Sequence, residues 1–180
     1  RIDDEHYQAA GFSRGSRISN SVDLAQPSAV PLGGLLVMSH LRDNDMQICS
    51  LGPYPVMDSV VNASGTTFAY GMTFSPTDVA TPDAFQSEIG GERDVTLTAV
   101  DAGGEILWST YFGGSEMEWP HNMALTPEGN VVLCGYTQSK DLPVRSAFRD
   151  ALACGDERHC ESDGYLAMFT PDGELLWSTY

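Results

Sequence analysis

Glu116, Glu118 and His121 are three acid–base side chains within six consecutive residues of this 180-residue chain. They follow Gly113-Gly114, where we expect a surface loop that leads into the next structural unit. Carboxylates on one rim of a protein can act together as general acid and general base, as in glycoside hydrolysis. Trp119 lies among them and has no repeated counterpart, which makes it the candidate for stacking on a ligand. The alternative is a surface loop with a structural tryptophan, and no catalytic residue is assigned.

Cys154 and Cys160 bracket the short polar segment Gly-Asp-Glu-Arg-His, which one disulfide could close. Such a bridge would indicate an oxidising compartment. Together with His159 the two thiols could supply three zinc ligands, but a structural zinc site needs four and the spacing reveals no fourth. We therefore predict no metal site and no cofactor. Calcium, which takes oxygen ligands, and a solvated acidic loop remain the alternatives for the neighbouring carboxylates. These are Asp156, Glu157, Glu161 and Asp163.

The segment Gly11-Phe-Ser13-Arg-Gly15 fits the G-x-S-x-G pattern of a serine nucleophile on a strained strand-to-helix turn. The internal repeat described below aligns Ser13 with Thr73 and Thr137, at the exit of a strand. We therefore expect an ordinary strand end there.

The charge of the chain excludes two classes of partner. Twenty-five acidic residues against nine Lys and Arg leave a formal net charge of −16. Nucleic-acid binding needs many basic residues, and so does attraction to an anionic membrane surface. No apolar run approaches the length of a membrane-spanning helix, so we expect no membrane insertion. The 18 glycines and 10 prolines favour a β protein with many turns.

The chain repeats itself. Trp108 and Trp177 lie 69 positions apart, and each opens an identical Trp-Ser-Thr-Tyr. Strand-like segments that end in Gly71 and Gly135 lie 64 positions apart, so an insertion of five residues separates the two landmarks. The 154–160 loop supplies that insertion. The residues that define the repeat are Trp108, Tyr111, Gly113, Gly114, Gly135, Trp177 and Tyr180.

Each copy divides into four short strands, which in the last copy we place at residues 122–126, 130–137, 164–170 and 174–180. Gly-containing turns at 127–129 and 171–173 join strands in antiparallel pairs, and a long connection runs over 138–163. The resulting units are a degenerate partial blade at 1–52, a blade at 53–112, and a blade with the inserted loop at 113–180. No helical period is evident.

Four-stranded antiparallel units of this length predict β-propeller blades, because a small twisted sheet cannot bury both of its faces alone. A ring closes with roughly four to eight blades, and the chain holds about three copies. We therefore expect a partial propeller. Either these residues belong to a longer chain, or several chains complete one ring.

The segment Trp-Ser-Thr-Tyr-Phe-Gly-Gly-Ser at 108–115 resembles the signature of the SBBP-type bacterial β-propeller repeat, a seven-bladed β-propeller repeat family. Gly129-Asn130, Gly135-Tyr136-Thr137 and Ala147-Phe148-Arg149 follow the pattern of that family in order. The likeness covers residues 59–180 well and the first 58 loosely. It implies a propeller in a secreted or cell-surface bacterial protein, usually within a long multidomain chain, and it implies no catalytic residue.

Two functions follow as expectations. The first is a non-catalytic extracellular or cell-surface module that acts as scaffold, adhesion or protein-assembly domain, with other domains of the same chain or other surface proteins as partners. The second is a glycan-binding or glycoside-active propeller that uses Trp119 and the loop carboxylates. The test between them is whether Glu116 and Glu118 reach one shared cavity.

Overall fold

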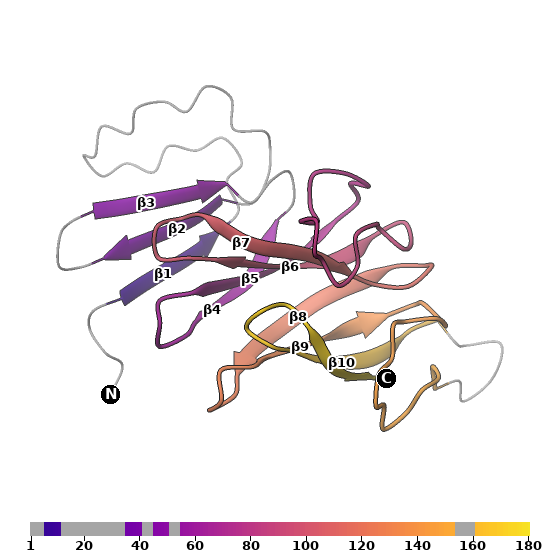
Figure 1. The fold of residues 1–180 in the computed structure, drawn as a ribbon. Coiled ribbons are helices and arrows are strands. Elements are labelled where there is room, and N and C mark those ends of the chain that lie inside the picture. The colour runs from indigo at the N-terminus through magenta and orange to yellow at the C-terminus, as the bar shows by residue number, and fades with distance from the viewer. Residues whose placement is uncertain (1–5, 12–34, 41–44, 51–54, 154–160) are drawn as a thin grey trace.

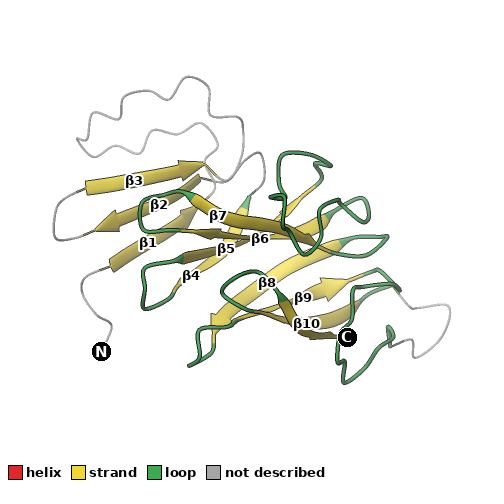
Figure 2. Cartoon of the chain, viewed as in Figure 1, coloured by secondary structure: helices red, strands yellow, loops and turns green. Residues whose placement is uncertain are grey.

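The computed structural model describes residues 6–11, 35–40, 45–50, 55–153 and 161–180. Over these residues the regular structure is all β, without a helix, as the sequence predicts (Figure 2). Accordingly, none of the described segments is a helix that could cross a membrane. The described strands form three antiparallel sheets, which follow one another along the molecule and do not close into a ring (Figure 1).

The N-terminal sheet has the order β1-β2-β3, the second the order β4-β5-β6-β7, and the third the order β11-β10-β9-β8. The N-terminal strands are β1 (His6–Gly11), β2 (Leu35–His40) and β3 (Asp45–Ser50). The second sheet contains β4 (Val56–Val61), β5 (Thr67–Thr73), β6 (Asp94–Val100) and β7 (Ile106–Phe112). The third contains β8 (Glu118–Leu125), β9 (Val131–Thr137), β10 (Asp163–Phe169) and β11 (Leu175–Thr179).

The same turn closes the hairpins of both four-stranded sheets. Its last residue is a glycine in the left-handed region, with φ between 86° and 88° at Gly65, Gly104, Gly129 and Gly173. The glycine N–H donates to the carbonyl three residues earlier, as from Gly129 to Thr126 at 2.9 Å. Glycine occupies this backbone region without steric cost, so these short loops favour it. The turns predicted at 127–129 and 171–173 are confirmed.

Gly71 and Gly135, which the sequence places at strand ends, lie inside β5 and β9, two residues before each strand ends. The same close contact explains a glycine at both positions. A Cβ on Gly71 would lie 2.2 Å from the carbonyl oxygen of Pro55, and one on Gly135 would lie 2.1 Å from that of Trp119. A β-bulge adjoins both contacts, in the pairing of β4 with β5 and in that of β8 with β9. Bulges bend a strand toward its neighbour, and here the approach leaves no space for a side chain.

The main hydrophobic core lies between the sheets β4–β7 and β8–β11. Phe68, Leu97 and Phe112 of the first sheet pack with Tyr165 and Phe169 of the second. The hydroxyls of Tyr70 and Tyr165 form a hydrogen bond to each other inside this core, and Tyr70 also donates to the carbonyl of Cys134 at 3.2 Å. Buried tyrosines need such partners, so the pair joins the sheets while burying its rings.

Burial along the strands differs in part from what the sequence suggested. The apolar run 131–134 indicates a strand covered on both faces, and β6 is indeed buried along its whole length. In β9, however, Val131 and Leu133 are buried whereas Val132 and Cys134 are partly exposed. The reason is that, within the described residues, a sheet packs on only one face of β8–β11.

Candidate functional site

The candidate acidic residues do not all lie in a loop. We expected a strand from residue 122, but β8 begins at Glu118, so Glu118, Trp119 and His121 belong to the strand. That expectation was wrong because hydrogen bonds made across the sheet junction, and invisible in a local pattern, extend the strand. The N–H of Glu118 donates to the carbonyl of Arg93 at 2.9 Å, and Glu118 is in register with Thr137 of β9.

The carboxylate of Glu118 is fully buried and internally bonded. It accepts hydrogen bonds from the hydroxyl of Thr137 at 2.5 Å, the hydroxyl of Ser139 at 2.6 Å and the amide of Gly114 at 3.1 Å. Burial raises the pKa of Glu118 above its ordinary range, while the three donors oppose that rise. With 0% of its surface exposed, Glu118 cannot reach a ligand in solution. Its bonds instead tie β8 to β9 and to the segment that follows β7.

Asp94 is a second buried carboxylate beside Glu118. Its side chain accepts from the amide of Gln86 at 2.8 Å and from the backbone of Gly90–Gly91 at 2.9 and 3.3 Å. Burial raises the pKa of Asp94 as well. A Cβ on Gly113 would lie 2.4 Å from a carboxyl atom of Asp94 and 2.4 Å from one of Glu118. Gly113 therefore lies between two buried carboxylates, both of which accept hydrogen bonds from within the fold.

The next residues of the Gly-Gly-Ser segment attach to the loop after β9. The amide and the hydroxyl of Ser115 both donate to Asp141 at 2.9 Å, which lowers the pKa of that carboxyl. The amide of Glu116 donates to the hydroxyl of Ser139 at 2.9 Å. Ser139 and Asp141 were absent from the sequence-based candidates. The sequence does contain one signal for Ser139: Thr73 and Ser75 recur 64 positions later as Thr137 and Ser139.

Trp119 is packed within the protein. Its ring stacks on Tyr136, with centroids 4.7 Å apart and planes at 13°, and the guanidinium of Arg93 lies 3.9 Å from its centroid. Arg93 also lies over Phe74. It is only 9% exposed, its Nε and Nη2 have no hydrogen-bond partner among the described residues, and burial lowers its pKa. Cation–π attraction holds the charge there. A ligand contact at Trp119 remains a prediction that must compete with these neighbours.

Glu116 and His121 lie at the surface, apart from the buried carboxylates. Glu116 lines a shallow polar hollow of about 360 Å³ together with Lys140 and Glu161. Glu118 does not contribute to it. His121 is exposed and shares a hydrogen bond with the side chain of Asn122 at 3.0 Å. The structure therefore does not bring Glu116 and Glu118 into one cavity, which a two-carboxylate mechanism on these residues would require.

The threonine of the repeated Ser-Thr-Tyr fastens the long connection of each sheet to its last strand. The hydroxyl of Thr110 accepts from the amide of Gln86 at 2.9 Å, and that of Thr179 accepts from the amide of Arg149 at 2.8 Å. Each hydroxyl also donates, at 2.9 Å, to the main-chain carbonyl of the tyrosine that follows it. The motif therefore fixes the long connection to the last strand in both sheets, an arrangement that we call the loop clamp.

The tyrosine of the motif makes the matching bond on the other side of the loop. The hydroxyl of Tyr111 donates to the carbonyl of Ser75 at 2.8 Å, and that of Tyr180 donates to the carbonyl of Ser139 at 2.8 Å. The two acceptors lie 64 positions apart, which is the offset of the first two strands. Tyr180 also accepts from the amide of Leu142 at 2.9 Å. These tyrosines thus stabilise the connection within their own sheet.

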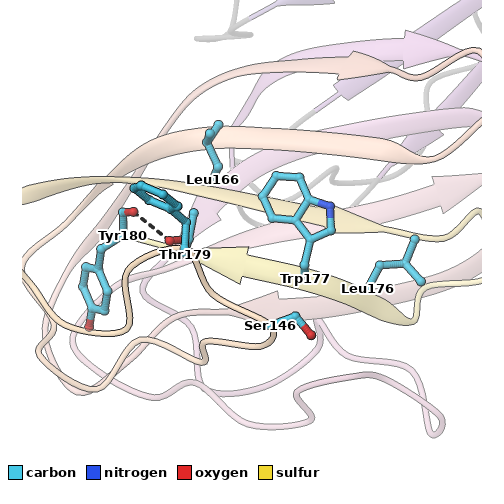
Figure 3. A pocket seen from close by; sticks show the side chains of 7 residues that line it. Ser146, Leu166, Leu176, Trp177, Thr179 and Tyr180 are labelled. Carbon is cyan, nitrogen blue, oxygen red and sulfur yellow. Dashed lines mark hydrogen bonds between the residues drawn. The ribbon is translucent and has the colours of Figure 1, made fainter.

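The tryptophan of the motif reaches across to the neighbouring sheet. The indole N–H of Trp108 donates to the carbonyl of Pro171 at 2.8 Å, in the β10–β11 turn, and its ring leaves no space for a Cβ on Gly173. Trp177 is the equivalent residue of the third sheet, and it lines an open hollow of about 660 Å³ with Leu166 and Leu176 (Figure 3). The repeated tryptophan therefore has a partner in one sheet and an open surface in the other.

Some sequence-based candidates fall outside the described residues. Ser13, Cys154 and Cys160 are among them, with Asp156 and Glu157, so the disulfide and the calcium alternative stay predictions. Among residues that are described, Cys134 is a free thiol, and no group of three or more Cys, His, Asp or Glu is placed to hold a metal ion. The carboxylate of Asp163 accepts from the side chain of Arg149 at 2.5 Å and from the amide of Ala153 at 2.7 Å.

No protein-family model matches the chain, and a search of curated proteins finds none that matches it.

Proposed function

We propose that the 180-residue chain is part of a β-propeller built from repeats of the SBBP type. This propeller is a non-catalytic scaffold, adhesion or assembly module of a secreted or cell-surface protein. Its partners are then other domains of the same chain or other surface proteins.

One observation carries the proposal. The sheets β4–β7 and β8–β11 repeat the same turns, the same close glycine contacts and the same Ser-Thr-Tyr loop clamps, and one sheet packs face to face on the other. Units that repeat their internal bonds and bury a face only against a neighbour are the building principle of propellers. The SBBP resemblance lies in these same residues.

The state of the candidate acids favours a binding module over an enzyme. The carboxylate of Glu118 accepts three internal hydrogen bonds in a site closed to solvent. A glycoside-active site would need a proton donor and a base that a sugar can reach. Of the two glutamates that the sequence offered, Glu116 alone is exposed to solvent.

The test of this proposal uses the natural protein. Electron microscopy should show ring-shaped particles with a central channel, and protease added to intact cells should remove the module from their surface. A panel of glycosides should show no turnover. The contrary result is turnover that Glu116→Gln abolishes while Glu105→Gln, an exposed glutamate in the β6–β7 turn, leaves it unchanged. That result would show that the module is an enzyme and would contradict the proposal.

A further inference from the structure

Arg93 is a buried cation whose side chain lacks hydrogen bonds. It immediately precedes β6, and its carbonyl accepts from the amide of Glu118 at 2.9 Å, which fixes its backbone at the junction of the two sheets. The side chain is only 9% exposed, and its Nε and Nη2 atoms have no hydrogen-bond partner among the described residues. Arginine is almost never buried in this way unless it is paired, because an unpaired buried charge is costly.

The other two arginines of the described ranges differ from Arg93 in this respect. The side chain of Arg145 donates to the carbonyl of Leu175 at 2.9 Å. The side chain of Arg149 donates to the carboxylate of Asp163 at 2.5 Å. These two arginines hold parts of the fold together through hydrogen bonds. The Nε and Nη2 atoms of Arg93 do not, so their hydrogen-bonding capacity is unused.

The two unpartnered nitrogens lie on one edge of the guanidinium. The N–H groups of Nε and Nη2 point the same way in the plane of the group, and together they form a fork that matches the two oxygens of a carboxylate. The buried acid nearest in the argument, Glu118, does not fill this fork, because its oxygens accept from Thr137, Ser139 and Gly114. The fork therefore lacks the partner that its geometry fits.

Aromatic rings contact the guanidinium of Arg93. It lies 3.9 Å from the ring centroid of Trp119 and 5.4 Å from that of Phe74, and Trp119 stacks on Tyr136. We call these four residues the arginine cluster. The rings attract the positive charge, but they do not replace strong hydrogen-bond acceptors. Phe74 is 65% exposed and Tyr136 is 40% exposed, so the cluster reaches the surface although the guanidinium is covered.

The internal repeat does not account for the arginine cluster. At the offsets of 64 and 69 positions, its members correspond to residues of other kinds. In the order Phe74, Arg93, Trp119 and Tyr136, these equivalents are Gln138, Ser162, Pro55 and Met72. Both four-stranded sheets form the same turns and loop clamps, although the sequence repeats neither the arginine nor the rings. The cluster is therefore an addition to the repeat, as a binding site would be.

We propose that the Nε–Nη2 edge of Arg93 binds the carboxylate of a ligand, which enters when the ring of Phe74 moves off the guanidinium. Phe74 is the ring best placed to move, because it is exposed and lies farther from the guanidinium than Trp119 does. Two charge-assisted hydrogen bonds then satisfy the buried nitrogens. This site goes beyond the proposed function, which names no small ligand, and it does not depend on that function.

The charge of the chain favours a carboxylate over a phosphate. The chain has a formal net charge of −16, and the single positive charge of Arg93 balances the single negative charge of a carboxylate. Glu118 lies close enough to act electrostatically on Arg93. The second charge of a phosphate would be repelled there without a further cation to balance it. Simple organic acids and sugar acids both present a carboxylate, and the test below separates them.

The test titrates the full 180-residue chain, isotopically labelled, with four probes while NMR follows the arginine Nε–H groups. The probes are acetate, glucuronate, glucose and inorganic phosphate, at constant pH and ionic strength. Acetate and glucuronate should both shift the Nε–H signal of Arg93 until it saturates, whereas the signals of Arg145 and Arg149, which have partners, stay in place. Glucose and phosphate should leave Arg93 unchanged. Tighter binding of glucuronate than of acetate assigns the site to sugar acids, and equal binding assigns it to simple carboxylates.

Three variants then locate the site, with affinities measured by calorimetry. Arg93→Lys should weaken carboxylate binding by about tenfold or more, because lysine keeps the charge but lacks the fork. Lys140→Gln is the matched control, since it removes an exposed positive charge outside the arginine cluster and should leave the affinity unchanged. Phe74→Ala should strengthen binding several-fold, because the ligand no longer has to displace the ring. Phe74 is largely exposed, so this variant should fold as the parent does.

Three results would overturn the proposal. The first is the absence of a saturable shift at Arg93 in both the parent and Phe74→Ala. The second is binding of phosphate as tight as that of acetate, and the third is an unchanged affinity in Arg93→Lys. If Arg93→Lys does not fold, the titrations of the parent and of Phe74→Ala decide, because both retain Arg93. An unchanged affinity in Phe74→Ala would overturn the entry route past that ring.

Discussion

The sheets β4–β7 and β8–β11 have the same internal bonds and different surroundings. Both use the same left-handed glycine turns, and in both the threonine and tyrosine of Ser-Thr-Tyr hold the long connection. Yet β6 is buried on both faces, whereas Leu166 of β10 is 43% exposed. The comparison separates two levels of structure. Hydrogen bonds within a repeat depend on its own residues, and the burial of its faces depends on its neighbours.

Substitution of the matched glycines of β5 and β9 should have the largest effect. We expect Gly71→Val and Gly135→Val each to destabilise the fold by more than about 4 kcal/mol, because the new Cβ meets a backbone oxygen at 2.2 and 2.1 Å. Chemical denaturation measures the free energy of unfolding. Gly164→Ala is the control, since its Cβ would approach other atoms only to 3.8 Å and should change stability by less than about 0.5 kcal/mol. A tolerated valine at one site alone would break the equivalence of the two sheets.

The two repeated tryptophans should differ. Trp108→Ala removes a ring packed between the sheets and its bond to Pro171, and should cost about 3 kcal/mol of unfolding free energy. Trp177→Ala, at the open hollow, should cost less than about 1 kcal/mol. Urea titration of the two variants at one pH measures the difference. Equal losses would mean that the surface around Trp177 is covered in solution.

The two clamp tyrosines should both contribute to stability. Tyr111→Phe and Tyr180→Phe each leave a carbonyl, that of Ser75 or Ser139, without the hydroxyl that donates to it, and Tyr180→Phe also leaves the amide of Leu142 without this acceptor. Each loss should be at least about 1 kcal/mol of unfolding free energy. Hydrogen exchange of the 74–93 and 138–153 connections, compared with the parent, should show local opening near the changed tyrosine. A variant that is as stable as the parent would show that its clamp contributes nothing.

The buried Glu118 predicts a small dependence of stability on pH. Because burial raises its pKa in the folded state, the folded protein binds this proton more tightly than the unfolded chain. The resulting stability is fully present below the unfolded pKa and is lost as the pH rises through the folded pKa. Relative to Glu118→Gln, the parent should therefore lose stability as the pH rises from acidic values through the folded-state pKa of Glu118.

Unfolding curves at several pH values measure that difference, and Glu105→Gln, at an exposed position, is the control that should track the parent. A parent that gains stability over Glu118→Gln as the pH rises would contradict the sign of the effect.

Much of the fold could be predicted from the sequence, and much less of the candidate site. The strands on either side of the 127–129 and 171–173 turns follow from local patterns, because a glycine with positive φ and an apolar run act over a few residues. The site depends on residues far apart. Glu118 accepts from Ser139, and Trp119 carries the guanidinium of Arg93, so neither environment is visible in the residues beside it.

The sequence by itself determined the repeat, its offsets of 64 and 69 residues, the hairpin turns and the all-β class, because each rests on short-range backbone geometry that recurs wherever the same residues recur. Only the tertiary structure decided that Glu118 is a buried structural acid, that Trp108 binds the β10–β11 turn and that Trp177 lines an open hollow. Burial is a property of two packed surfaces. Identical Trp-Ser-Thr-Tyr segments therefore acquire different roles when one has a neighbouring sheet and the other, among the described residues, has none.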